Sequence, residues 1–340
     1  MLRALAAVAV VSSVAAVVAA QTPKTHRLEA TPSTVAYGWY DAAAKPVLTI
    51  ASGDIIDVDT LLTNRPVGLR RAGVPEDQIQ QSLKDIEDQV PQDQRGPGGH
   101  ILTGPIFVEG AEPGNVLEVK VLSIDLAIPY GYNGCSGYIR ENCSDDRAQR
   151  TRIIPLDAKT MTASFAPGIT IPLHPFFGSM GVAPDPAAGR ISSNPPGTHA
   201  GNLDNRLLVA GTTLFIPVHA RGALFEIGDG HAAQGDGEVD QTAIETSLRG
   251  RLQLTVRKDM TLTWPRAETP TLYIAMATDK DLAVATKTAI QEMIDFLARE
   301  KHLDKQTAYQ LTSVAGNVAI TQLVDGNVGV HVTLPKEIFR

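Results

Sequence analysis

Alternation of apolar and polar residues is the commonest pattern along the chain. Residues 117–121 and 251–257 place an aliphatic side chain at every second position, which is the period of a strand with one buried face. Near the C-terminus, Asp325-Gly326 separates two apolar runs and is typical of a hairpin turn. Further strands are predicted over residues 47–57, 207–219, 222–227 and 271–277.

Helical periodicity occurs in only three places. Apolar residues recur every three or four positions from Ile79 to Val90, from about Leu282 to Arg299, and over a short stretch from Lys305 to Val314. Asp281 precedes the second of these and can accept the free amides of its first turn. Residues 158–206 are rich in Pro, Gly and Asn and predict a long loop. The pattern therefore predicts a mainly β fold with additional helices.

The first twenty residues differ from the rest. Arg3 is followed by a run of small apolar residues that ends at Val18-Ala19-Ala20, before Gln21. This arrangement predicts a secretory signal peptide cleaved near Ala20 and a mature domain over residues 21–340. An uncleaved membrane anchor is the alternative, because the run is nearly long enough to span a bilayer. We expect a secreted or periplasmic protein that is free of the membrane after cleavage.

Charge and cysteine content narrow the function. The 340-residue chain has a formal net charge of -7 and contains no basic block, which disfavours nucleic-acid binding. Its two cysteines, Cys135 and Cys143, both follow the signal segment. In an oxidising compartment a local disulfide is the natural pairing, whereas a catalytic cysteine would need a free thiolate.

Residues 226–240, EIGDGHAAQGDGEVD, concentrate the strongest candidate chemistry. The segment holds Asp229, His231, Asp236, Glu238 and Asp240, with glycines between them. In an extended backbone, residues two apart face the same side, so Asp229 and His231 could bind one ion, and the Asp236 and Glu238 side chains share that spacing. The alternative is a pair of hairpin turns with solvated acids, which leaves the histidine unexplained.

Three other segments carry isolated histidines. NPPGTHAGNLDNR holds His199, Asn202 and Asp204, either as a proline-rich connector or as a loop that delivers these groups to the first cluster. In GPGGHILTG, His100 could cap a strand, and the Gly98 and Gly99 amides could bind an oxyanion.

LHPFFGSMGVAP is the last of these segments. His174, Phe176 and Phe177 could wall a small pocket or form a buried turn. No G-x-S-x-G, H-E-x-x-H or P-loop motif occurs. Hydrolysis would therefore use an activated water rather than a serine or cysteine nucleophile.

Taken together and in order, these segments resemble the acetamidase/formamidase family. The matching stretches are GHILTGPIFVEGAEPGNVLEV, LHPFFGSMGVAP, NPPGTHAGNLDNRLLVAGTTLFIPV, GALFEIGDGHAAQGDGEV and GVHVTLPKEIF. The resemblance runs from about Leu28 to the C-terminus. It implies a β-sandwich-like fold, a homo-oligomer, a divalent metal ion and hydrolysis of a short-chain amide, such as formamide or acetamide, to ammonia and a carboxylate.

Chemical inference on these motifs assigns roles. Asp204, Asp229 and His231 would bind the metal, and zinc suits such mixed nitrogen and oxygen ligands. Glu238 would be the general base. A catalytic His199 or a substrate-binding His100 would stabilise the oxyanion.

The remaining side chains of these motifs have looser assignments. Asn202 would contact substrate. Asp236 would either assist catalysis by contacting the metal ligands, without binding the metal itself, or belong to a turn. The rival hypothesis is a non-catalytic extracytoplasmic β-sandwich that binds a cation or small ligand. The signal peptide also departs from the cytoplasmic location expected of nitrogen-scavenging amidases, which leaves the physiological amide open.

Overall fold

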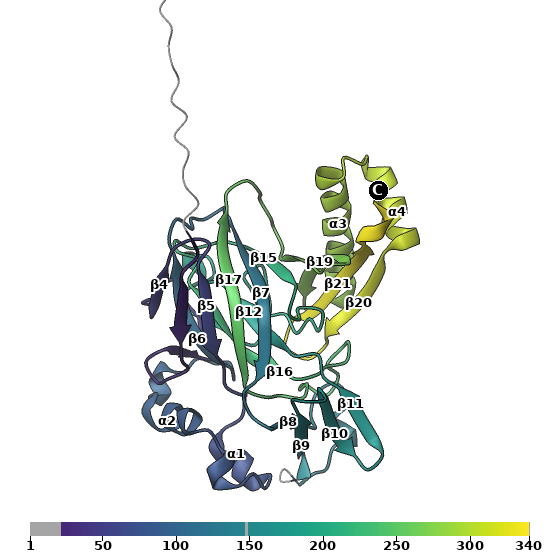
Figure 1. The fold of residues 1–340 in the computed structure, drawn as a ribbon. Coiled ribbons are helices and arrows are strands. Elements are labelled where there is room, and N and C mark those ends of the chain that lie inside the picture. Colours follow the sequence, from purple (N-terminus) through teal and green to yellow (C-terminus); the bar gives the residue numbers. More distant parts are fainter. Residues whose placement is uncertain (1–21, 147–148, 340) are drawn as a thin grey trace, which may run out of the picture.

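Two packed β-sheets form the body of the molecule in the computed structural model, which describes residues 22–146 and 149–339 (Figure 1). The larger sheet has the strand order β1-β5-β17-β7-β15-β18-β19-β21-β20. Its strands are β1 (Thr25–Leu28), β5 (Ile55–Asp59), β7 (Val116–Leu126), β15 (Thr213–Pro217), β17 (Leu248–Arg257), β18 (Arg266–Glu268), β19 (Leu272–Asp279), β20 (Asn317–Gln322) and β21 (Val328–Pro335).

The second sheet supplies most of the strands that reach the candidate site. Its order is β14-β12-β16-β6-β2, and β4 pairs with β6 beside this path. Its strands are β2 (Val35–Tyr37), β4 (Leu48–Ile50), β6 (Ile101–Val108), β12 (Phe176–Gly181), β14 (Ala200–Asn202) and β16 (Phe225–His231).

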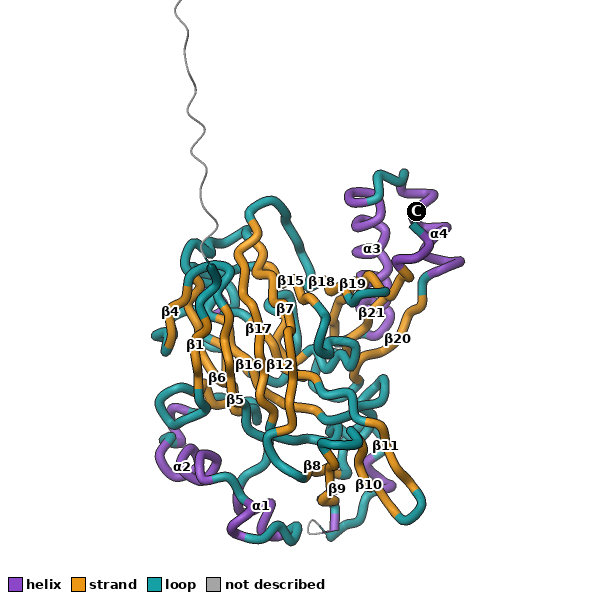
Figure 2. The backbone as a smooth tube through the Cα atoms, viewed as in Figure 1, coloured by secondary structure: helices purple, strands orange, loops and turns teal. Residues whose placement is uncertain are grey.

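Smaller elements surround the two sheets (Figure 2). A four-stranded sheet of order β11-β10-β9-β8 contains β8 (Tyr130–Gly134), β9 (Thr151–Asp157), β10 (Thr162–Ala166) and β11 (Ile169–Pro172), and β3 (Trp39–Tyr40) pairs with β13 (Ile191–Ser192). The helices are α1 (Pro66–Arg71), α2 (Gln81–Gln89), α3 (Leu282–Glu300) and α4 (Lys305–Ala315). The predicted β-sandwich-like fold with additional helices is confirmed.

The main core lies between the two large sheets. Val121 and Leu252, paired across β7 and β17, belong to the same buried cluster as Phe177 of β12 and Ile227 of β16. Each such side chain contributes about 1.5–3 kcal/mol by leaving water. Gly250 on β17 gives the Phe177 ring its space, since a Cβ there would lie 2.7 Å from the ring. This packing fixes β12 and β16 against a rigid sheet.

Most of the predicted elements are present. The hairpin at Asp325-Gly326 joins β20 to β21, and the Asp281 carboxylate caps α3 by accepting from the Ala283 and Val284 amides. The expectation of one long loop over residues 158–206 is wrong, because this stretch contains β10 to β14. These strands are short and hold several glycines and prolines, so no apolar period marks them, and their neighbours in the sheets complete their hydrogen bonds.

The remaining predictions concern the signal peptide, a membrane anchor and the pairing of the two cysteines. The predicted signal peptide lies outside the described residues. Within residues 22–146 and 149–339, no helix has the length and apolar character needed to cross a membrane. Cys135 and Cys143 form a disulfide, as predicted.

Candidate functional site

Strand β16 carries two of the predicted side chains into the interior. Asp229 is 4% exposed and His231 is 1% exposed, so neither belongs to a solvated turn. The His231 Nε2 atom lies 3.2 Å from Asp229 Oδ2 and 3.3 Å from Glu245 Oε1. The Phe176 ring of β12 meets the imidazole edge-on and holds its orientation.

Two further acids approach from loops. Glu238 Oε1 lies 4.0 Å from His231 Nε2. Asp204 follows β14, and its Oδ2 accepts a hydrogen bond of 2.9 Å from the Asn202 side chain. Asp325, in the β20–β21 turn, lines the same small cavity as Asp204, and after burial, the larger cause, its carboxyl group helps to raise the pKa of Asp204. Five carboxyl groups from separate parts of the chain therefore surround one imidazole.

A small cavity of about 50 Å³ lies among these groups. Its lining includes predicted residues and others that the sequence did not single out: Thr63, His100, Tyr132, Asn202, Asp204, Asp229, Glu238, Gln241, Thr242, Glu245 and Asp325. A few water-sized groups fill such a space. The cavity therefore suits a very small substrate or an ion with its water.

The tautomer of His231 follows from its neighbour Gln234. The Gln234 amide nitrogen donates to the carbonyl oxygens of Asp204 and Thr321, which turns its oxygen toward His231. An amide oxygen can only accept, so His231 Nδ1 donates across the 2.9 Å contact. In the neutral ring, Nε2 then presents a lone pair to the carboxylates. This orientation suits a metal ligand, because the partner fixes the ring and a cation relieves the repulsion.

Burial shifts the pKa values of the acids in different directions. Burial first, and neighbouring carboxylates second, raise the pKa of the Asp204 carboxyl well above its usual range. Burial also raises the pKa of Glu238, against the attraction of His231. Burial opposes ionisation of Asp229 too, but His100, His231 and the Thr63 hydroxyl hold its pKa below the usual value. So many acids cannot all ionise in this space without a compensating cation.

Several polar atoms in the cluster lack hydrogen-bond partners. Asp204 Oδ1, His231 Nε2 and Glu245 Oε2 are buried without one, which is costly unless another group satisfies them. Two sets of ligand atoms lie close enough to hold one ion: Asp229, His231 and Glu245, or Asp204, His231 and Glu238. The donors present therefore fit a divalent metal ion. The predicted ligands are all here, but Asp204 and Asp229 fall into different sets.

Unusual backbone conformations accompany the cluster. Asp204, Asp229 and Glu238 have φ angles of 43°, 55° and 42°. Left-handed backbone is unfavourable for residues with a Cβ and is often found at functional sites. Here it turns all three carboxylates toward His231.

Residues 54–189 and 186–340 match the sequence profile of the Acetamidase/Formamidase family. The chain belongs to the acetamidase/formamidase family. Solved relatives include an acetamidase from Bacillus halodurans, 27% identical with a TM-score of 0.77 over 92% of this chain and 98% of that one. A predicted acetamidase/formamidase from Thermoanaerobacter tengcongensis is 26% identical with the same TM-score over 93% and 97%.

The matches to curated relatives cover a smaller share of each relative's chain than the matches to solved structures do. A formamidase from Methylophilus methylotrophus is 24% identical over 318 residues, which cover 71% of this chain and 77% of that protein. An acetamidase from Mycolicibacterium smegmatis is 27% identical over 205 residues, 42% of this chain and 49% of that protein. This acetamidase/formamidase family member thus spans about half the length of two of the curated relatives it matches.

Two predicted site residues of this protein lie away from the cavity at the His231 cluster. His199 lines a separate cavity of about 360 Å³ together with His219, and burial lowers its pKa to about 4. Asp236 is partly exposed and bonds to Arg206 at 2.9 Å. The cavity around the cluster therefore receives His100 and Asn202, but neither His199 nor Asp236 is among its lining residues.

The glycine-rich segment around His100 also differs from one expectation. The Gly98 amide donates to the Gly38 carbonyl oxygen, and the Gly99 amide donates to the Asn194 side chain. Neither amide is free to bind an oxyanion. His100 itself bonds to the Ser193 hydroxyl through Nδ1 at 2.9 Å, and its Nε2 lies 3.7 Å from Asp229.

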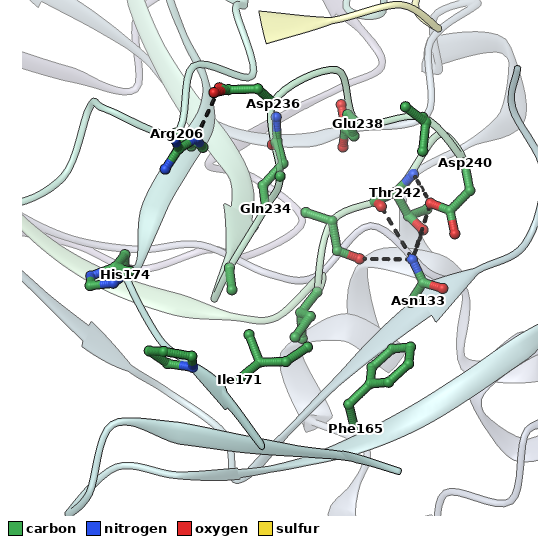
Figure 3. A pocket seen from close by; sticks show the side chains of 16 residues that line it. Asn133, Phe165, Ile171, His174, Arg206, Gln234, Asp236, Glu238, Asp240 and Thr242 are labelled. Carbon is green, nitrogen blue, oxygen red and sulfur yellow. Dashed lines mark hydrogen bonds and ion pairs between the residues drawn. The ribbon is translucent and has the colours of Figure 1, made fainter. Parts of the chain in front are cut away.

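A larger cavity of about 500 Å³ adjoins the segment that carries Glu238 (Figure 3). Phe165, Ile171 and His174 line it, as do the Arg206–Asp236 ion pair and Gln234. Phe176 and Phe177, for which the sequence allowed either pocket walls or a buried turn, are fully buried in β12. Only the histidine of that group contributes to this cavity.

Glycine at position 178 leaves space beside the acids. A Cβ there would lie 2.5 Å from both Asp204 Oδ1 and Asp229 Oδ2. We expect Gly178→Ala to displace these carboxylates and lower metal affinity and amide turnover by at least about tenfold, the scale of a misplaced ligand shell. Gly235→Ala is the matched control, because no atom lies within 4 Å of its Cβ. Equal metal affinity and turnover in the two variants would contradict this placement.

Proposed function

We propose that this protein hydrolyses the carbon–nitrogen bond of a short linear amide, releasing ammonia and a carboxylate. The observation that carries the proposal is the cluster of buried acids around His231 in a small cavity. Relatives named acetamidase and formamidase support this reaction class. The cavity volume of about 50 Å³ supports amides with few heavy atoms.

Asp229, His231 and Glu245 are the proposed ligands of a zinc ion. Two contacts favour this set, because the carboxylates of Asp229 and Glu245 both lie nearer His231 Nε2 than that of Glu238 does. When bound, zinc would supply Lewis-acid activation of water and substrate. Glu245 therefore joins two of the predicted ligands, and Glu238 is left free for proton transfer.

Glu238 is the proposed proton carrier. Its carboxylate would accept a proton from the attacking water and pass it to the leaving nitrogen. The raised pKa of Glu238 suits both steps. A carboxylate with a raised pKa takes a proton from water more readily than an ordinary glutamate, and the resulting acid can still give that proton to the leaving nitrogen. Such transfer contributes about 10²–10⁴-fold to the rate.

His100 and Asn202 are the proposed substrate contacts. If the Ser193 hydroxyl donates to His100 Nδ1, the ring carries its proton on Nε2, which can then donate to the developing oxyanion. Asn202 Oδ1 is buried without a partner, so it can accept from the substrate amide N–H. Asp204 is proposed to hold Asn202 in place through their 2.9 Å hydrogen bond.

Secretion, a periplasmic location and a homo-oligomer stay predictions.

Ammonia release from amides of increasing size tests the proposal. We expect turnover of formamide and acetamide, and kcat/KM lower by about 100-fold or more for benzamide, because a ring does not fit the cavity. Ammonia would be quantified enzymatically, with Glu238→Gln protein as the background. Absence of ammonia from every amide, with metal bound, would instead favour the non-catalytic binding function.

A further inference from the structure

We propose that the disulfide-closed loop 135–143 positions Glu238, and that reduction of the Cys135–Cys143 bond slows amide hydrolysis. The inference rests on the proposed function, since Glu238 is there the proton carrier. It concerns residues of this loop that touch neither the cavity nor its acids directly. The loop acts through the segment 237–241, which follows the cavity wall.

The segment 237–241 has an unfavourable backbone conformation. Glu238 and Gln241 have φ angles of 42° and 76°. Gly237, directly before Glu238, has a φ of 99°. Left-handed conformations at residues with a Cβ persist only where the surroundings enforce them. Val239 is 57% exposed, so the segment gains little from apolar burial of its own. Within the segment, the Gln241 amide donates to the Glu238 carbonyl oxygen at 2.9 Å and closes a turn, and contacts with neighbouring elements fix where that turn lies.

Strand β20 holds the segment before Glu238. The Gly237 amide donates to the Thr321 carbonyl oxygen at 3.1 Å, and the Leu323 amide donates to the Gly237 carbonyl oxygen at 3.0 Å. Among the described residues, no hydrogen bond joins β20 to residues 239–241. A second support is needed on that side.

The disulfide loop supplies that second support. The Tyr138 amide donates to the Val239 carbonyl oxygen at 2.8 Å, and the Ser136 hydroxyl donates to the Gln241 side chain at 3.3 Å. Gly137 lies directly against the backbone of Asp240, because a Cβ at Gly137 would come within 2.6 Å of the Asp240 Cα. Loop and segment thus meet backbone to backbone.

Strand β8 continues the same support. The Asn133 side chain donates to Asp240 Oδ1 and to the Thr242 hydroxyl, as the dashed lines in Figure 3 show. The Gly134 amide also donates to the Thr242 hydroxyl at 2.8 Å. Glu238 therefore lies between two anchored points, one on β20 and one on the β8 and disulfide-loop side.

The cross-link explains how a loop without regular strand structure can act as a support. Cys135 begins the loop directly after β8, where its amide donates to the Arg150 carbonyl oxygen. With the disulfide intact, only residues 136–142 lie within the closed ring. Opening it removes the closure of residues 136–142, and a segment without that closure loses order more easily. Reduction is then expected to release the contacts at Gly137 and Tyr138.

Reduction of the disulfide tests the inference. We expect a reductant to lower kcat for acetamide by about tenfold, part of the contribution of proton transfer, with little change in KM. The Cys135→Ser/Cys143→Ser protein should have the same low kcat and show no further response to the reductant. Unchanged kcat in both the reduced protein and the double variant would overturn the inference.

Hydrogen exchange gives a readout that does not require activity. Amides of residues 237–242 should exchange at least about tenfold faster after reduction, while those of β7 and β17 stay protected. If the oxidised protein releases no ammonia from any amide, the proposed function fails, and this exchange decides the positioning alone. Equal exchange of residues 237–242 before and after reduction would contradict it.

Two glycine variants separate positioning from general destabilisation. Gly137→Ala keeps the disulfide but pushes its Cβ against Asp240, and we expect it to lower kcat by about tenfold with KM retained. Gly168→Ala, in the β10–β11 turn, is the matched control: its φ is also positive, at 76°, and nothing lies within 4 Å. Similar melting temperatures with reduced kcat only for Gly137→Ala would support the inference. Equal kcat in both variants would overturn it.

Discussion

Replacing Glu238 with Gln is expected to lower kcat for acetamide hydrolysis by about 10²–10⁴-fold, the contribution of a positioned proton carrier. Glutamine keeps the size of the side chain but cannot take a proton from water. Because Glu238 lies 4.0 Å from His231 Nε2, farther than Asp229 and Glu245, bound zinc should remain near the wild-type amount. Steady-state ammonia release and metal analysis on the same preparation measure both quantities.

Asp236→Asn is the matched control for this variant. Both acids lie in the same short segment, but Asp236 points outward to Arg206 at 2.9 Å. We therefore expect kcat within about twofold of wild type, since exposed ion pairs contribute little. A comparable loss of kcat in the two variants would remove Glu238 from its special role. Loss of metal from Glu238→Gln would make it a ligand instead.

Replacing His231 with Ala is expected to abolish metal binding and to lower kcat by about 10³-fold or more, since a catalytic metal contributes several kcal/mol to the barrier. The imidazole supplies the one nitrogen ligand, and it is common to both sets of candidate ligands. Its removal also leaves buried carboxylates without their cationic or metal-bound partner. Metal content, measured after dialysis against a trace of zinc, should fall well below one ion per chain.

A milder change keeps this prediction testable if His231→Ala does not fold. Gln234→Ala removes the acceptor of the His231 Nδ1 proton but no ligand, and should weaken zinc binding by about 10–100-fold. His174→Ala, on an exposed histidine of the larger cavity, serves as the control. Zinc affinity equal to wild type in both Gln234→Ala and His231→Ala would exclude His231 as a ligand.

The sequence predicted part of this site because local spacing places some residues together. Asp229 and His231 lie two apart on β16, and the strand brings both into one cluster. The same reasoning paired Asp236 with Glu238, but the chain does not stay extended there. The left-handed backbone at Gly237 and Glu238 turns one side chain inward and leaves the other at the surface.

Other members of the cluster depend on tertiary structure. Glu245 belongs to no motif in the sequence, and it contacts His231 from the segment that leads into β17. The one feature of the sequence that could have indicated it is an acidic residue between the apolar Ile244 and the start of the strand. Asp325 was predicted as a turn residue, and the turn is present, but its carboxyl group reaches Asp204 from a distant part of the chain. His199 lies close to Asn202 in sequence, yet a separate cavity receives it.

The fold followed from the sequence where one face of an element is buried. Residues 251–257 and Leu282–Arg299 show regular periods because the sheet core and the β19–β21 surface bury one side of each. The short strands between residues 158 and 206 show no such period. Their position is set by neighbours, as when Met180 of β12 pairs with Ile227 of β16.

Titration of the metal-free protein with zinc tests the central claim most directly. Chelator-treated protein should release no ammonia from acetamide, and activity should rise in proportion to added zinc until about one ion is bound per chain, as expected for a single catalytic site. The same titration on Glu238→Gln protein should bind zinc without restoring ammonia release. Full ammonia release by metal-free protein, or none at full zinc occupancy, would contradict hydrolysis at the His231 cluster.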